Sequence, residues 1–178
     1  MWPKRRVHTA PTAAAQDGSN QALDQIANWV RFADTKATVL TAGLGVAMTM
    51  LASNSTTILN AARQSWVSGL CVGGPAALAL IAFIWTLFWL IKAIGPQRKV
   101  SYMLPNRFSW PSLSRASVAD LKQHLASSTV AEDAWQQVLD LSKLADRKFA
   151  ACEKAVYGFG ALIFLGFFSV MTAMAIAP

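Results

Sequence analysis

Residues 76–91 read AALALIAFIWTLFWLI, a run in which Thr86 is the one polar side chain. The run lies within residues 64–91, which contain no Asp, Glu, Lys or Arg. A helix needs about 20 mostly apolar residues to cross the hydrocarbon core of a bilayer. The sequence therefore predicts a transmembrane helix here, which we place at residues 68–91.

Two more windows lack charged residues, at residues 37–62 and 155–178. The last one is nearly as apolar as the run above. The first is weaker, because its apolar part ends in the polar run SNSTT at residues 53–57, and a buried helix of a soluble protein is the alternative for so short a stretch. Its two strong neighbours favour a membrane span. We predict an all-α integral membrane protein with three transmembrane helices, at residues 37–58, 68–91 and 155–177.

Basic residues are distributed unevenly around the three predicted spans. The chain has 5 Lys and Arg before the first span, 1 between the first and second, 10 between the second and third, and 0 after the third. Segments rich in Lys and Arg stay on the cytoplasmic side. The N-terminus and the long link at residues 92–154 are therefore predicted to be cytoplasmic, and the short loop at residues 59–67 and the C-terminus external.

The predicted cytoplasmic parts differ in structure. Residues 1–19 are small, polar and basic, without the apolar core of a signal peptide, and predict a retained disordered tail. Residues 20–36 have the apolar spacing of a helix. Thr129 and Glu132 have the spacing of a capping box. No Pro follows up to Ala177 and no Gly occurs before Gly158, so one helix is predicted from about Val130 through the third span.

Smaller features suggest simple structural roles. The net charge of +7 lies on the predicted cytoplasmic side, and Arg98, Lys99 and Arg107 are interpreted as contacts to anionic lipid headgroups. Glycines within the predicted spans, at positions 43, 45, 73 and 74, are interpreted as places where two helices pack closely.

Several functional classes have no support in the sequence. Cys71 and Cys152 lie far apart along the chain, as do His8 and His124, so we expect no disulfide framework and no metal site. No nucleophile, base and orienting acid form a plausible catalytic group, and we expect a protein that is not an enzyme and needs no cofactor. The spans carry no ionisable residue at mid-depth, which argues against a transporter. Nucleic acid is not an expected partner.

Two motifs resemble those of a known family. Residues 33–37 read ADTKA and close a helix directly before the first span, and residues 139–149 read LDLSKLADRKF and lead into the last span. Both motifs, their order and the length of the chain resemble the Pycsar transmembrane effector family. The likeness covers about residues 20–178, and the polar outer end of the first span departs from it.

The resemblance implies a biological role. Family members are effectors of bacterial antiphage defence in the inner membrane. A partner uridylate or cytidylate cyclase makes cyclic UMP or cyclic CMP on infection, and this cyclic pyrimidine nucleotide activates the effector. The activated effector impairs the membrane and causes abortive infection. The resemblance thus implies the lipid bilayer and a cyclic nucleotide as partners, and we expect a homo-oligomer.

Basic and aromatic residues near the two motifs are candidates for the nucleotide site. A phosphate needs cationic donors and a pyrimidine needs a stacking surface. The candidate ligand-binding residues are Arg31, Asp34, Lys36, Lys143, Arg147 and Lys148, with Trp135 and Phe149 for base stacking. For Asp34 and Lys36 the alternative is a salt bridge to the second helix, or a lysine that extends to the lipid headgroups. For Lys143, Arg147 and Lys148 it is a solvated or lipid-facing basic surface, and for the two aromatic residues it is core packing.

Two other functions fit the same spans. One is a constitutive membrane scaffold whose cytoplasmic helices bind a protein partner. The other is a small holin-like channel that opens without a ligand. Binding of cyclic CMP or cyclic UMP would distinguish the nucleotide-controlled effector from both.

Overall fold

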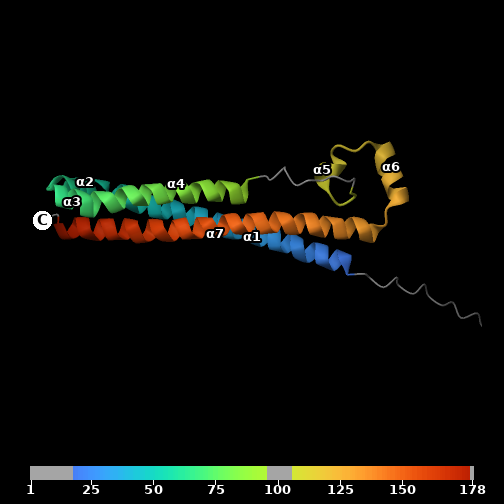
Figure 1. The fold of residues 1–178 in the computed structure, drawn as a ribbon, viewed down its shortest axis with the longest axis horizontal. Coiled ribbons are helices and arrows are strands. Elements are labelled where there is room, and N and C mark those ends of the chain that lie inside the picture. The colour runs from blue at the N-terminus through green and yellow to red at the C-terminus, as the bar shows by residue number, and fades with distance from the viewer. Residues whose placement is uncertain (1–17, 96–105, 177–178) are drawn as a thin grey trace, which may run out of the picture. The chain divides into compact units, whose positions relative to one another are not determined.

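The structure is a computed structural model that describes residues 18–95 and 106–176. The predicted disordered tail therefore lies almost wholly outside the described residues, as do Arg98 and Lys99. The elements in chain order are α1 (Ser19–Ser53), α2 (Ser55–Arg63), α3 (Trp66–Ser68), the π-helix η1 (Gly69–Gly73), α4 (Gly74–Ile94), α5 (Trp110–Leu113), α6 (Val118–Ser127) and α7 (Val130–Ile176) (Figure 1).

The described residues are mostly helical, and they contain no β-strand. Within them, the helical stretches Ser19–Ser53, Trp66–Ile94 and Val130–Ile176 are long and apolar enough to cross a membrane. The predicted all-α fold with three membrane-spanning helices is confirmed. The 47 residues of α7 also confirm the predicted continuous helix through the third span.

The helix of the first span is interrupted at Asn54, inside the predicted span at residues 37–58. Its side-chain amide donates a hydrogen bond of 2.8 Å to the carbonyl of Met50, which competes with the regular backbone pattern. The chain resumes as α2, so residues 59–63 of the predicted external loop are helical.

A π-helix precedes α4 within the second membrane-spanning stretch. Pro75 lies in the first turn of α4 and has no N–H to donate, which disturbs the regular ladder of hydrogen bonds before it. Ser169 of α7 contacts this region, because its hydroxyl donates a hydrogen bond of 2.9 Å to the carbonyl of Val72.

The chain divides into two compact units. The described part of the first unit comprises residues 18–27 and 106–142, and that of the second comprises residues 28–95 and 143–176. In the first unit, α6 and α7 begin at capping boxes. Ser117 and Asp120 form the first. In the capping box of α7, as predicted, the Thr129 N–H donates to the Glu132 carboxylate at 2.9 Å and the Glu132 N–H donates to the Thr129 hydroxyl at 3.2 Å.

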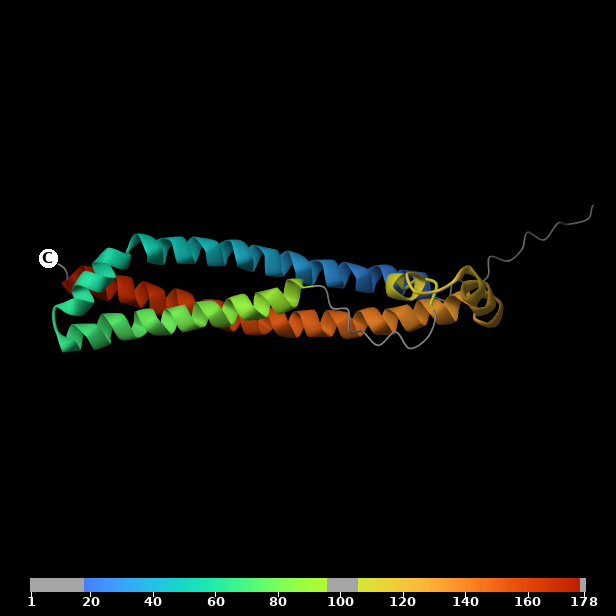
Figure 2. The same cartoon turned by 90° about the horizontal axis from the view of Figure 1, so that it is seen from above.

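Small residues fill the core of the second unit, where α1, α4 and α7 run alongside one another (Figure 2). Most of the buried residues are alanines, which let the helix backbones approach closely. The buried core residues are Ala37, Leu44 and Ala47 of α1, Ala79, Leu90 and Ala93 of α4, and Ala151, Cys152, Ala155 and Leu162 of α7.

The interpretation that glycines mark close packing between helices is correct at one of the four positions. A Cβ on Gly43 would lie 3.1 Å from the ring of Phe159, so α1 and α7 pack closely there. A Cβ on Gly73 would meet only ordinary van der Waals contact, and one on Gly45 or Gly74 would meet no atom within 4 Å. A Cβ on Gly158 of α7, by contrast, would lie 2.5 Å from Thr86 Oγ1 of α4, so these two helices pack closely there.

Candidate functional site

The two motifs meet in the second unit. Lys148 of α7 forms an ion pair with Asp34 of α1, through Nζ and Oδ1. The Lys148 side chain is 9% exposed and that of Asp34 is 44% exposed. This pair joins residues 114 positions apart, and it is the interhelical salt bridge considered for Asp34 as an alternative to ligand binding.

The alanines of the ADTKA motif explain how the two helices approach. Ala33 and Ala37 lie one helical turn apart and are both buried. The thiol of Cys152 donates a hydrogen bond of 3.6 Å to the carbonyl of Ala33. A larger side chain at either alanine would separate the helices and lengthen the Asp34–Lys148 ion pair.

Aromatic side chains flank the ion pair. The Lys36 ammonium lies 4.5 Å from the ring centroid of Phe32 and 5.6 Å from that of Phe149. The Phe149 ring also packs edge-on against Trp29, with 6.2 Å between centroids. A cation over an aromatic face is stabilised by about 0.5–1 kcal/mol at exposed sites. Lys36 and Phe149 therefore stabilise the contact between α1 and α7.

The other four predicted site residues are exposed on α1 and α7. Arg31, Lys143 and Arg147 are exposed side chains on α1 and α7 in the second unit. Trp135 belongs to the first unit and is 45% exposed. Of the eight predicted residues, the structure brings together Asp34, Lys36, Lys148 and Phe149.

Asp133 in the first unit is the centre of a polar network that the sequence did not reveal. Its carboxylate accepts hydrogen bonds from Arg107 Nε at 2.5 Å and from the Ser128 hydroxyl at 2.8 Å, and it lies 2.9 Å from His124 Nε2. Asn106 donates from Nδ2 to the Asp133 carbonyl at 2.7 Å. The network fixes the Asn106–Arg107 segment and α6 to the start of α7.

The interpretation of Arg107 as a contact to lipid headgroups is therefore wrong. Besides Asp133, the guanidinium donates from Nη2 to the Ser128 carbonyl at 2.8 Å. Burial alone would raise the pKa of Asp133, but hydrogen bonds from Arg107, Ser128 and His124 hold this pKa below its ordinary value. The sequence held one signal for this network, because Asp133 is an acidic residue in the first turn of α7. Carboxylates at that position ordinarily interact with the N-terminus of their own helix, so the partner Arg107 was not indicated.

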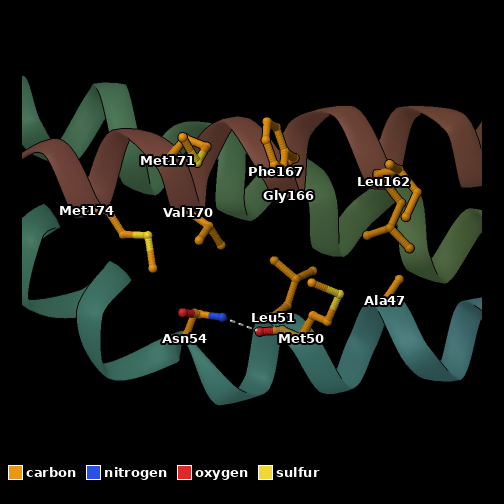
Figure 3. A pocket seen from close by; sticks show the side chains of 11 residues that line it. Ala47, Met50, Leu51, Asn54, Leu162, Gly166, Phe167, Val170, Met171 and Met174 are labelled. Atoms are coloured by element: carbon orange, nitrogen blue, oxygen red, sulfur yellow. Dashed lines mark hydrogen bonds between the residues drawn. The ribbon is translucent and has the colours of Figure 1, made fainter.

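An apolar groove of about 360 Å³ lies between α1 and α7 in the second unit (Figure 3). Asn54 is the one polar side chain of its lining, and its amide is turned toward the carbonyl of Met50. The lining residues are Ala47, Met50, Leu51, Asn54, Leu162, Ile163, Gly166, Phe167, Val170, Met171 and Met174.

The ion pair and the groove differ in their chemistry. Within residues 18–95 and 106–176, no group of three His, Cys, Asp or Glu side chains could hold a metal ion. The ion pair and the neighbouring Lys36 are charged, whereas the groove is lined by apolar side chains apart from Asn54.

Comparison with known proteins identifies the family. Residues 19–177 match the family model of the Pycsar effector protein domain. No curated protein and no solved structure matches the chain. The match extends from the first residue of α1 to beyond the last residue of α7, so it includes both motifs and all three membrane-spanning helices. The chain therefore belongs to the Pycsar effector family of antiphage defence and is a multi-pass membrane protein of that family.

Proposed function

We propose that this protein is a non-enzymatic membrane effector that a cyclic pyrimidine nucleotide activates. A partner cyclase would supply cyclic CMP or cyclic UMP, and the activated effector would impair the inner membrane and cause abortive infection. The observation that carries the proposal is the Asp34–Lys148 ion pair, which joins the two motifs next to the spans of α1 and α7. Membership of the Pycsar effector family supports the link to a cyclase.

The ion pair suggests how an anionic ligand could act. A cyclic nucleotide carries one phosphodiester charge, which can replace the carboxylate as the partner of Lys148. Asp34 is nearly half exposed, so water can solvate its carboxylate after the exchange. The exposed Arg31, Lys143 and Arg147 and the nearby Lys36 supply further positive charge, and a guanidinium can bind a phosphate through two hydrogen bonds.

The base would require an aromatic surface. Phe149 is half-buried beside Lys36, and stacking on it would displace Trp29 from its edge-on contact. Trp135, the other predicted stacking residue, belongs to the first unit and lies 13 residues before Lys148. That is about 20 Å of helix, so one nucleotide would not reach both residues. Binding would then change the contact between α1 and α7.

Such a change can reach the membrane through the same two helices. Because α7 is continuous from Val130 to Ile176, a shift near Lys148 can move its transmembrane part as well. The groove between α1 and α7 provides space for that movement. A ligand can drive it only to the extent that it binds one arrangement more tightly than the other.

The excess of basic residues outside the spans supports the orientation in the proposal. The N-terminus and the link between α4 and α7 would face the cytoplasm, and the C-terminus the periplasm. A nucleotide made in the cytoplasm would then meet the Asp34–Lys148 pair directly. We further propose that several copies assemble in the membrane, since the groove that the described residues of one copy form between α1 and α7 is apolar apart from Asn54.

Calorimetric titration of the detergent-solubilised protein tests the proposal. We expect heat of binding with cyclic CMP or cyclic UMP and none with cyclic AMP. Arg147→Ala should weaken binding by at least tenfold because it removes a phosphate donor, whereas Lys122→Ala, an equal charge change in the first unit, should leave affinity unchanged. Absence of binding to both pyrimidine nucleotides would refute the proposal and favour a scaffold or a ligand-independent channel.

A further inference from the structure

Two lysines share one tryptophan ring at the end of a membrane-spanning helix. The Lys92 ammonium, in the last turn of α4, lies 4.9 Å from the ring centroid of Trp89. The Lys154 ammonium of α7 lies 4.1 Å from the same centroid. Lys92 also lies 4.6 Å from the Phe88 centroid. Two ammonium groups, one from α4 and one from α7, therefore contact the same aromatic ring.

Trp89 also presents an unused hydrogen-bond donor. Its indole Nε1 is buried and has no hydrogen-bond partner among the described residues. A buried indole N–H ordinarily has one. Lys154 forms no ion pair with a carboxylate in the described parts of the chain. The cluster thus combines two cationic side chains, which attract an anion, with a buried N–H that lacks an acceptor among the described residues.

The position of the cluster indicates which anion it meets. Lys92 directly follows the uncharged residues 64–91, and Lys154 directly precedes the uncharged residues 155–176. Both lysines therefore lie at the level where the apolar spans end, which is the headgroup region of a bilayer. The Trp85 and Phe88 side chains of α4 are about half exposed and offer an apolar surface for an acyl chain.

We propose that Lys92, Lys154 and Trp89 form a binding site for the phosphate of an anionic phospholipid. The two ammonium groups would bind the phosphodiester oxygens, the indole N–H would donate to one of them, and an acyl chain would lie along Trp85 and Phe88. A zwitterionic lipid carries its own cation close to the phosphate, and the two lysines would repel that cation. The site therefore selects lipids with net negative charge.

Native mass spectrometry of the full chain, extracted from vesicles with equimolar phosphatidylcholine and phosphatidylglycerol, tests this site. We expect the wild type to retain phosphatidylglycerol preferentially. Lys92→Gln/Lys154→Gln should reduce that preference roughly tenfold or more. The matched control, Arg115→Gln/Lys122→Gln, removes the same charge from exposed positions in the first unit and should keep the preference.

Two further variants separate the roles of charge, ring and N–H. Lys92→Arg/Lys154→Arg keeps both charges and should keep the preference. Trp89→Phe keeps an aromatic ring but removes the N–H, and should reduce the preference severalfold, less than the double lysine variant. A normal thermal unfolding curve for each variant establishes that the fold is intact.

Three outcomes would overturn the site. The first is equal retention of the two lipids by the wild type. The second is the same loss in the control pair, which would indicate a general effect of net charge. The third is displacement of the lipid by cyclic CMP, cyclic UMP or inorganic phosphate through Lys92 and Lys154, which would assign the site to a soluble phosphate. Nucleotide binding at the Asp34–Lys148 pair is measured separately, so either proposal can fail without the other.

Discussion

Gly158 of α7 lies directly against Thr86 of α4. A Cβ on Gly158 would be 2.5 Å from Thr86 Oγ1 and 2.7 Å from Trp85 Cδ1, which is closer than non-bonded atoms can approach. Thr86 itself is fully buried, and its hydroxyl donates a hydrogen bond of 2.7 Å to the Ala82 carbonyl. The packing of α4 on α7 therefore requires a residue without a side chain at position 158.

Substitution of this glycine is expected to destabilise the second unit. Gly158→Ala should lower the free energy of unfolding by about 1–3 kcal/mol, because α4 and α7 must separate to admit the methyl group. Gly160→Ala is the matched control, since a Cβ there meets no atom within 4 Å and alanine favours helix by about 1 kcal/mol. Thermal unfolding in detergent measures both, and equal midpoints for the two variants would contradict the close contact.

The Asp34–Lys148 pair is expected to respond asymmetrically to removal of either charge. Asp34→Asn leaves a mostly buried ammonium without its partner and should destabilise the protein by about 1–2 kcal/mol, with allowance for the exposure of Asp34. Lys148→Met leaves a carboxylate that water can reach and should have a smaller effect. A double-mutant cycle on thermal unfolding gives the coupling energy, and the prediction fails if Lys148→Met is the more harmful change.

Sequence reasoning succeeded where local patterns decide the structure. The runs without charge predicted the three membrane-spanning helices, and the absence of Pro and of early Gly predicted the length of α7. The capping box at Thr129 and Glu132 was correct because it depends on residues three positions apart. Each of these features is determined within a few turns of helix.

Contacts between distant residues were harder to predict. A salt bridge could be predicted for Asp34, but its partner Lys148 could not be chosen from several basic residues. The choice depends on how α1 and α7 are rotated about their axes. The same rotation decides that Gly158 meets α4 whereas Gly74 meets nothing. Arg107 was assigned to the lipid surface because its partner, Asp133, lies 26 residues away.

The Asp133 network is expected to weaken in acid. A carboxylate whose pKa is lowered by folding contributes stability above its unfolded pKa, about 4, and loses that contribution as the pH falls through the folded value. Amide protection of α6, corrected for intrinsic exchange rates, should therefore decrease below about pH 4 relative to its value at pH 5.

A variant isolates the contribution of Asp133. Hydrogen bonds within the capping boxes also lower the pKa of Asp120 and Glu132, so these groups titrate in the same range. Asp133→Asn cannot ionise and should reduce the protection of α6 at neutral pH, while showing a smaller decrease in acid than the wild type. An identical acid profile in the variant would assign the pH dependence to the capping boxes.

We expect that neither alanine nor lysine at position 107 can hold α6 as arginine does. The guanidinium donates to both Asp133 and the Ser128 carbonyl, and an ammonium cannot reproduce this geometry. Both Arg107→Ala and Arg107→Lys should increase hydrogen exchange in α6 by about tenfold, as expected for the loss of charged hydrogen bonds. Arg115→Ala, an exposed arginine in the same unit, should change nothing, and full protection in Arg107→Lys would mean that charge alone suffices.

The groove between α1 and α7 provides a test of how binding leads to membrane damage. Val170 of α7 lines the groove, and a phenylalanine there would occupy the space into which the two helices are proposed to move. Val170→Phe should therefore bind cyclic CMP or cyclic UMP with unchanged affinity but release much less dye from vesicles when the nucleotide is added. The variant separates recognition from action because Val170 lies far along α7 from Lys148.

Val156→Phe is the matched control for the groove, because Val156 is about half exposed on the same helix and does not line the cavity. This variant should bind nucleotide and release dye as the wild type does. If Val170→Phe releases dye normally, closure of the groove is not the step that follows binding. Membrane damage would then arise from contacts on the outer, lipid-facing surfaces of the three helices, where assembly of several copies rather than movement within one copy would be required.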